Sequence, residues 1–262
     1  MTLQGSRTRN RRWLPWTIPA LAMGLWFLVT PTPIRELTFP SPGSVWAAVL
    51  AIRSGLLTNA AATLTRVLLG WLMGASLGIL VGLLMTASDP LERLLHPLLE
   101  FLRPLPTVAL IPFFIIWFGI GEVGQVTLIG LAAFVVLVVN TFVAVHIVPD
   151  RYIRAASLLG ASTTRTYRTV IVPAIVPSLV GGLRTSAAVA FAVGIAAEFL
   201  GAQTGLGYMI MVARRTLNTN TILLGVLIVA AESFLLDYGI RLLAQYFTRW
   251  LRDSRDALEL LT

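Results

Sequence analysis

The sequence predicts an all-α, polytopic membrane protein with about six transmembrane helices. Its 262 residues are 56% hydrophobic and only 12% charged, with a mean hydropathy of +0.82. That balance is too apolar for an ordinary soluble domain. Three long runs contain no charged residue: Val67–Met85, Pro104–Gly121 and Gln125–Val145. Each is close to the roughly 20 apolar residues that cross a bilayer core of about 30 Å.

We expect one transmembrane domain over residues 14–250, between an N-terminal arm (1–13) and a C-terminal tail (251–262). The first apolar segment follows a cluster of arginines, as in a cleaved signal peptide. We favour an uncleaved helix, because Pro31–Pro33 follows it rather than a small-residue cleavage site. The expected spans are 14–30, 59–86, 98–119, 125–148, 175–200 and 221–247.

Proline and glycine distinguish two of these spans. The third contains Pro104, Pro106 and Pro112. Proline removes an amide donor and clashes with the preceding turn, so we expect this helix to be kinked. The second span carries glycines at four-residue spacing on one face, which permits close contact with a neighbouring helix: Gly70, Gly74, Gly78 and Gly82.

The basic residues exclude several functions and predict the orientation. All 20 are arginine, and without lysine the chain cannot form a P-loop for ATP. With a cytoplasmic N-terminus, twelve arginines fall in inside segments, four in outside segments and four within spans. The positive-inside rule then predicts that both termini are cytoplasmic. Because the arginines flank spans rather than forming one patch, we expect no nucleic-acid partner.

Catalytic and metal chemistry have few residues available. The absence of cysteine excludes disulfides and thiol catalysis. The two histidines, His96 and His146, are far apart in the chain, so we expect no metal site. We therefore expect a protein that is not an enzyme.

The segment between the fourth and fifth spans, residues 150–173, is polar and basic. We expect Asp150 to cap a first short helix, Gly160 to end it in a left-handed conformation, and Ser162 to cap a second helix. Tyr167 lies in that second helix and is a candidate exposed anchor for a soluble partner; Pro173 would end the helix. The same pattern also fits an amphipathic hairpin lying on lipid headgroups.

This segment resembles the signature loop of permease subunits of binding-protein-dependent ABC importers. The family pattern is E-A-A, three residues, G, nine residues, then I-x-L-P. Ala155, Ala156, Gly160 and Pro173 match at the required spacing, whereas Arg154 stands at the glutamate position. The resemblance implies a type I ABC importer permease fold.

Three further motifs are similar to the nitrate/sulfonate/taurine importer permeases: Phe39–Trp46, Phe101–Gly121 and Ala197–Tyr208. Members of that subfamily also serve bicarbonate, thiamine-precursor pyrimidines and riboflavin. The resemblance implies a bacterial inner-membrane subunit that translocates a small solute delivered by an extracytoplasmic solute-binding protein. A second permease chain, identical or different, would complete the pore within the membrane lipid.

The resemblance also implies two ATPase subunits, which bind ATP and Mg²⁺, while this chain carries no cofactor. Residues 150–173, with Ser162 and Tyr167 among them, would be the coupling loop on which each ATPase docks. An ATP-independent secondary transporter or channel is the alternative, for which inverted repeats would be expected. An intramembrane enzyme would need convergent acid–base groups, and none stand out.

Charged residues at membrane depth are functional candidates. Arg184 and Glu232 are expected at similar depths in the fifth and sixth spans, and we hypothesise that they pair or face the same aqueous pore. A salt bridge that only packs helices is the alternative. Asp237 and Arg241 fit an i,i+4 pair near the cytoplasmic end.

The expected outer loop, residues 201–220, should be a short helical segment. Gly205 and Gly207 permit a tight turn there. Tyr208, Met209 and Met211 are expected near the external mouth of the pore, although an interfacial tyrosine is the alternative for Tyr208.

Overall fold

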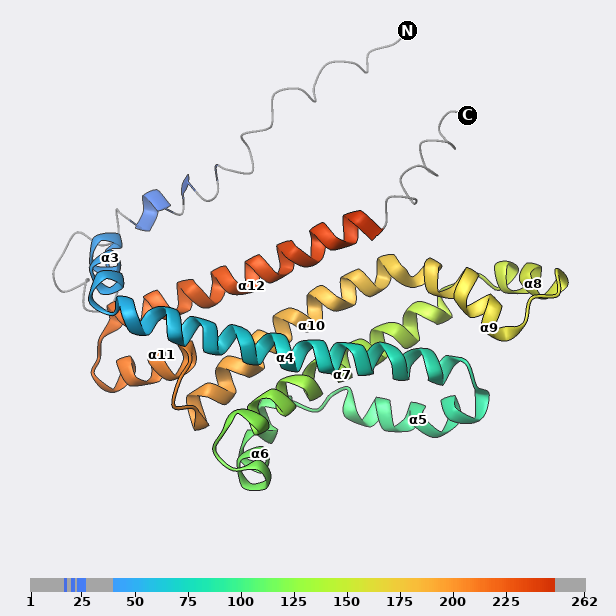
Figure 1. Ribbon diagram of the computed structural model, residues 1–262, viewed down its shortest axis with the longest axis horizontal. Coiled ribbons are helices and arrows are strands. Elements are labelled where there is room, and N and C mark those ends of the chain that lie inside the picture. Colours follow the sequence, from blue (N-terminus) through green and yellow to red (C-terminus); the bar gives the residue numbers. More distant parts are fainter. Residues whose placement is uncertain (1–16, 18–19, 22, 27–39, 248–262) are drawn as a thin grey trace, which may run out of the picture.

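Long helices lie side by side in the computed structural model, and the described residues contain no strand (Figure 1). The structure describes residues 17, 20–21, 23–26 and 40–247. The expected arm (1–13), the tail (251–262) and most of the first span (14–30) lie outside the described residues.

The helices follow one another with short connections. In chain order they are α3 (Pro42–Ala51), α4 (Arg53–Thr86), α5 (Asp89–Leu102), the 3₁₀ helix η1 (Thr107–Leu110), α6 (Ile111–Phe118), α7 (Glu122–His146), α8 (Asp150–Leu158), α9 (Thr163–Thr166), the π-helical turn η2 (Tyr167–Ile171), α10 (Val172–Gly201), α11 (Leu206–Arg215) and α12 (Thr219–Phe247).

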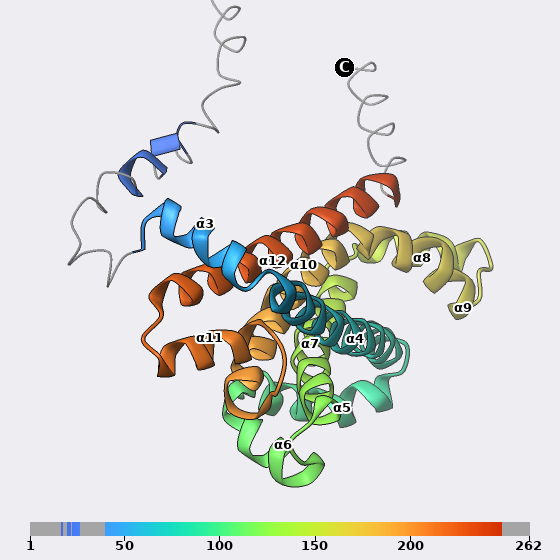
Figure 2. The ribbon, with the colours of Figure 1, turned by 60° about the vertical axis from the view of Figure 1, so that its left-hand side comes forward.

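Four segments of the described residues are long and apolar enough to cross a membrane: Gly55–Thr86, Glu122–His146, Thr163–Gly201 and Thr219–Tyr246. They overlap the second, fourth, fifth and sixth expected spans. A fifth crossing exists if the bent pair of α5 and η1–α6 is counted as one span. Both helices of this pair lie against α7 on the side away from α12 (Figure 2).

The prediction of one kinked helix over residues 98–119 is wrong. The helix is interrupted between Leu102 and Thr107, and the helical segments on either side meet at a bend of 86°. Two prolines fall in this break, Pro104 and Pro106, and each removes a backbone donor and clashes with the preceding turn. Pro112 lies in the first turn of α6, where a missing N–H leaves no hydrogen bond unmade.

The glycine face of α4 packs directly on α7, which confirms the prediction of close helix contact. A Cβ added at Gly74 would overlap the carbonyl oxygen of Gly130. At Gly70 it would lie 2.7 Å from the carbonyl oxygen of Val126, and at Gly82 2.7 Å from Cβ of Thr141. The two backbones therefore approach as closely as helices without side chains between them can.

The main core lies where α4, α6, α7 and α10 meet. Buried Val67, Phe114, Ile129 and Phe191 belong to one hydrophobic cluster there. Trp71 of the same cluster donates a hydrogen bond from Nε1 to the Ser186 hydroxyl of α10 at 2.9 Å. These contacts hold the four helices together.

Candidate functional site

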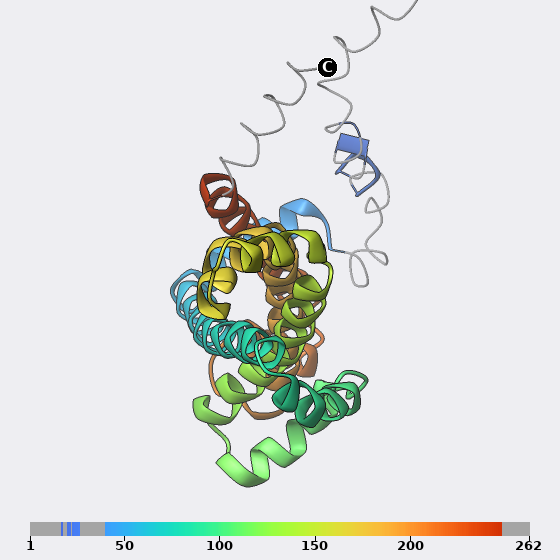
Figure 3. The same cartoon turned by 90° about the vertical axis from the view of Figure 1, so that its right-hand side faces the viewer.

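The loop of residues 150–173 projects beyond the ends of α4 and α7 at one end of the molecule (Figure 1). This end of the molecule faces the viewer in Figure 3. Gly160 has φ of +76°, which confirms the expected left-handed end of its first helix. The Ser162 hydroxyl accepts a hydrogen bond from the backbone N–H of Arg165 at 3.4 Å, as expected of an N-cap. The loop is therefore a helical hairpin.

Two local predictions for this loop are wrong. Asp150 is the first residue of α8 rather than its cap, because Pro149 holds the cap position. From there its carboxylate lies 3.6 Å from Nη2 of Arg154, one turn along the exposed surface.

Pro173 does not end the second helix. The proline ring would clash with a carbonyl one turn earlier, and the wider π-helical turn over Tyr167–Ile171 relieves this clash. The helix therefore continues from Thr163 to Gly201, 39 residues without a break. The second half of the loop is thus a direct extension of the membrane-spanning α10.

Tyr167 is not the exposed anchor that the sequence suggested. It is half-buried against a hydrophobic cluster that includes Val148 and Ile171, and so it holds the loop to the end of the bundle. The most exposed apolar residues of the loop are Leu158 and Leu159 at the tip, each 88% exposed. Hydrophobic side chains this open are typical of a surface that another molecule covers.

Between the two halves of the hairpin lies an open hollow of about 660 Å³. Three of the matched signature residues, Ala155, Ala156 and Pro173, line it together with Tyr152. The alanines have no side-chain atoms beyond Cβ, so this wall of the hollow stays open. Arg165 of α9 also lines the hollow and gives it a basic edge.

At the opposite end of the bundle, a buried ion pair joins α4 to α10. Glu198 is 3% exposed and Arg66 is 5% exposed, and Nη1 of Arg66 lies 3.0 Å from Oε1 of Glu198. The Thr63 hydroxyl donates to the same carboxylate at 2.8 Å, and the backbone N–H of Gly207 donates at 2.7 Å. A buried carboxylate is stable only with such a set of donors.

The same residues of α4 hold the turn that follows α10. Asn59 Oδ1 accepts from the backbone N–H of Gly205 at 2.8 Å, and the Thr63 hydroxyl accepts from Leu206 N–H at 2.7 Å. Arg66 donates to the Thr204 carbonyl at 2.8 Å. We call this set the Glu198 clamp: Asn59, Thr63, Arg66, Glu198 and the turn 202–207.

Two glycines make the clamp possible, which confirms the expected tight turn. Gly205 has φ of +122°, a conformation that other residues rarely adopt. A Cβ at Gly205 would lie 2.5 Å from the Glu198 carboxylate, and one at Gly207 would lie 2.8 Å from Glu198 Cβ. Arg66 also reaches Glu122 at 3.1 Å, whose side chain is 74% exposed at the start of α7.

Sequence reasoning missed the clamp, although a signal was present. Arg66 is the one charged residue of the expected span 59–86. An arginine at membrane depth needs a partner, and Glu198 lies among the glycines of the Ala197–Tyr208 motif. Joining the two residues required knowing that the start of α4 packs beside the end of α10.

The three residues expected at the external mouth are not brought together. Residues 206–215 form α11, as expected of a short helical loop, with Tyr208 partly exposed and Met209 buried. Both of these line an open hollow with Asn59 and Asn218, whereas Met211 does not. The hollow lies at the Glu198 clamp end of the bundle.

The structure does not pair Arg184 with Glu232. Arg184 Nε instead lies 2.5 Å from Oδ1 of Asp237, whose Oδ2 is 2.8 Å from Arg241 Nε. Residues 232 and 237 are roughly 140° apart around a helix, so only one of them can face Arg184. Glu232 is buried, and its Oε2 has no hydrogen-bond partner within the described residues. The expected Asp237–Arg241 pair is confirmed.

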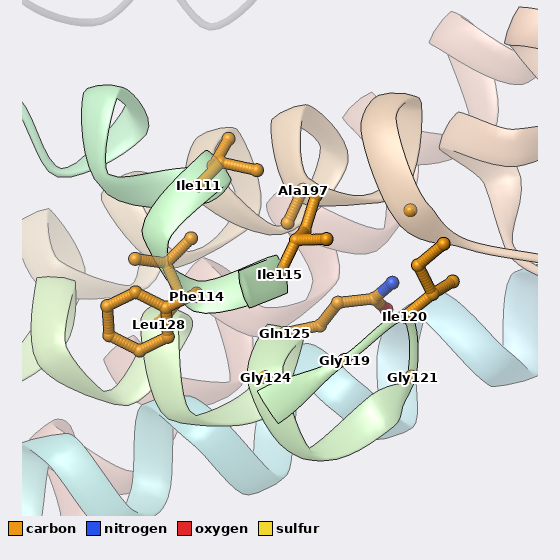
Figure 4. Close-up of a pocket in the computed structure, with 11 residues that line it drawn as sticks. Ile111, Phe114, Ile115, Gly119, Ile120, Gly121, Gly124, Gln125, Leu128 and Ala197 are labelled. Carbon is orange, nitrogen blue, oxygen red and sulfur yellow. The ribbon is translucent and has the colours of Figure 1, made fainter. Parts of the chain in front are cut away.

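A cavity between α6 and α7 is too small to hold a solute (Figure 4). Its volume is about 20 Å³, room for about one water molecule. Apolar Ile111 and Phe114 form part of its wall, and the Gln125 side chain lies beside it with no partner for Oε1 among the described residues. A buried water on Gln125 is all that this space admits.

Comparisons with known proteins agree with these features. Residues 74–253 match the family described as the binding-protein-dependent transport system inner membrane component. The chain is 35% identical over 241 residues to the taurine transport system permease protein TauC of Escherichia coli K12, covering 89% of this chain and 88% of that protein. It is 33% identical over 236 residues to the putative aliphatic sulfonates transport permease protein SsuC of Bacillus subtilis 168, covering 89% and 86%.

A solved structure shares the fold. The inward-facing MetNI methionine ABC transporter has a chain that matches with a TM-score of 0.60 and 21% identity, covering 73% of this chain and 97% of that one. The all-α importer permease fold is thereby confirmed. The family match includes the projecting loop and Glu198. This chain belongs to the family of inner-membrane permease components of binding-protein-dependent ABC importers.

Proposed function

We propose that the projecting loop of residues 150–173 is the site through which a separate ATPase subunit drives this permease. The observation that carries the proposal is the unbroken helix from Thr163 to Gly201. Any force on α9 is transmitted along this helix to α10, because no flexible joint separates them. The bound loop and the membrane span then move together, as a switching element requires.

The length of this helix also favours a soluble partner over the lipid surface. Its 39 residues extend ~58 Å, about twice the bilayer core of roughly 30 Å. The hairpin therefore extends beyond the bundle end rather than folding back along it (Figure 1). Leu158 and Leu159 are exposed where α8 ends. A headgroup-bound hairpin would lie in the plane of the membrane surface, with its apolar face toward the lipid tails.

The full transporter, in our proposal, contains two permease chains, two ATPase subunits that bind ATP and Mg²⁺, and an extracytoplasmic solute-binding protein. The loop faces the cytoplasm and the Glu198 clamp faces outward, consistent with the arginine distribution and cytoplasmic termini. The cargo is a small organic solute of the kind that the relatives' names give, taurine or another sulfonate. This chain contributes the path through the inner membrane and no catalysis.

Charged substitutions at the loop tip test the proposal. Leu158→Asp and Leu159→Asp are expected to remove the ATPase from the purified complex and to reduce uptake at least tenfold. Both residues are 88% exposed, so the chain itself should fold normally. Leu217→Asp is the matched control for ATPase binding, because Leu217 is 84% exposed beside α11, far from the loop. An ATPase that stays bound to both loop variants, with uptake unchanged, would contradict the proposal.

A further inference from the structure

Two arginines share one aspartate between α10 and α12. Asp237 lies 2.5 Å from Arg184 Nε and 2.8 Å from Arg241 Nε. One carboxylate thus faces two guanidinium groups, which leaves the cluster with a net charge of +1. Asp237 lies ten residues before the end of α12 at Phe247, ~15 Å along the helix.

The arginines have donors to spare. Each guanidinium has five N–H donors, yet both residues use chiefly Nε, with Arg184 Nη2 at a long 3.4 Å from Asp237. Within the described part of the chain, Asp237 is the only acceptor that either side chain contacts. The Arg184 side chain is 38% exposed and that of Arg241 is 52% exposed, so the unused donors are accessible.

The contrast with Arg66 shows that this arrangement is unusual for the chain. Arg66 is buried and its Nη groups donate to Glu198, Thr204 and Glu122, so it has no room for a ligand. The cluster of Arg184, Asp237 and Arg241 is accessible from outside the chain, and its single carboxylate neutralises only one of the two positive charges. An excess guanidinium inside a membrane span requires water or an anion beside it.

We propose that Arg184 and Arg241 together bind one oxyanion group, such as a sulfonate, carboxylate or phosphate, with Asp237 holding the two side chains in place. A guanidinium offers paired N–H donors whose spacing matches the oxygens of such a group. The net charge of +1 matches one singly charged ligand. If the oxyanion belongs to the cargo, this inference rests on the proposed function and names the residues that contact it during transit.

The phosphate of an anionic phospholipid offers the same chemistry, since basic sites between helices near the cytoplasmic face also bind lipid headgroups. Arg241→Gln distinguishes oxyanion binding, whether to cargo or to lipid, from a purely structural role of the cluster. The substitution removes the excess positive charge but keeps the Arg184–Asp237 pair. Arg103→Gln is the matched control, because Arg103 is an exposed arginine outside the cluster.

The experiment uses the complete transporter, with its ATPase and binding protein, in proteoliposomes of phosphatidylcholine. Uptake of radiolabelled ethanesulfonate and ATP hydrolysis are measured in parallel. Arg241→Gln should reduce uptake about tenfold while ATP hydrolysis persists, and Arg241→Lys, which keeps the charge without the paired donors, should recover part of it. Arg103→Gln should behave as wild type.

Native mass spectrometry after purification in phosphatidylglycerol identifies the other source. A phosphatidylglycerol molecule that stays on the wild type but not on Arg241→Gln, with uptake unchanged, assigns the oxyanion to lipid. If Arg241→Gln changes neither uptake nor bound lipid, the inference is overturned. If the wild-type chain never associates with an ATPase and imports nothing, the proposed function fails, and the lipid measurement still tests the site.

Discussion

Breaking the Glu198 clamp is expected to be among the most destabilising changes in this chain. Arg66→Met keeps most of the side-chain volume but leaves the buried Glu198 carboxylate with Thr63 and Gly207 as its remaining donors. Removing one partner of a buried pair costs about 3–5 kcal/mol, since the other charge stays buried without compensation. Glu198→Gln leaves Arg66 its contacts with Thr204 and Glu122, so we expect a smaller loss of about 2–3 kcal/mol.

The two substitutions together distinguish a coupled pair from two independent contributions. Because Arg66→Met and Glu198→Gln damage the same contact, the double variant should lose less stability than the two single losses added, by about 1–3 kcal/mol. Unfolding of the purified chain in detergent, induced by SDS and followed by tryptophan fluorescence, gives the three values. Additive losses, or an Arg66→Met loss below about 1 kcal/mol, would refute the reasoning.

Three other predictions follow from the packing and the topology. Gly74→Ala places a methyl group against a carbonyl of α7 and should cost about 1–3 kcal/mol in the same unfolding assay, whereas Gly55→Ala, whose nearest atom is 3.9 Å away, should be close to neutral. In this naturally cysteine-free chain, Ser157→Cys should react with an impermeant maleimide only in inside-out vesicles and Leu217→Cys only in right-side-out cells; labelling of both from one side would contradict the proposed orientation. Tyr167→Ala should lower the free energy of unfolding by about 1–3 kcal/mol, as loss of a half-buried core residue does, and an unchanged stability would return Tyr167 to the docking surface.

Some features of the projecting loop could be predicted from the sequence, and others could not. Gly160 and Ser162 are predictable, because a left-handed helix end and an N-cap depend on neighbours within a few positions. Tyr167 and Pro173 are not. Whether a tyrosine is exposed depends on what packs against it, and whether a proline ends a helix depends on whether a wider turn can absorb it.

Within the membrane, the amino-acid sequence alone determines which segments are apolar enough to span and that the glycine face of α4 must meet another helix. These properties are local sums of transfer energy and side-chain size. The tertiary structure alone decides which charges meet. Arg66 pairs with Glu198, 132 residues away in the chain, and Arg184 pairs with Asp237 rather than with Glu232. Such pairings depend on the rotation and depth of each helix, which packing of the whole bundle sets and no single segment encodes.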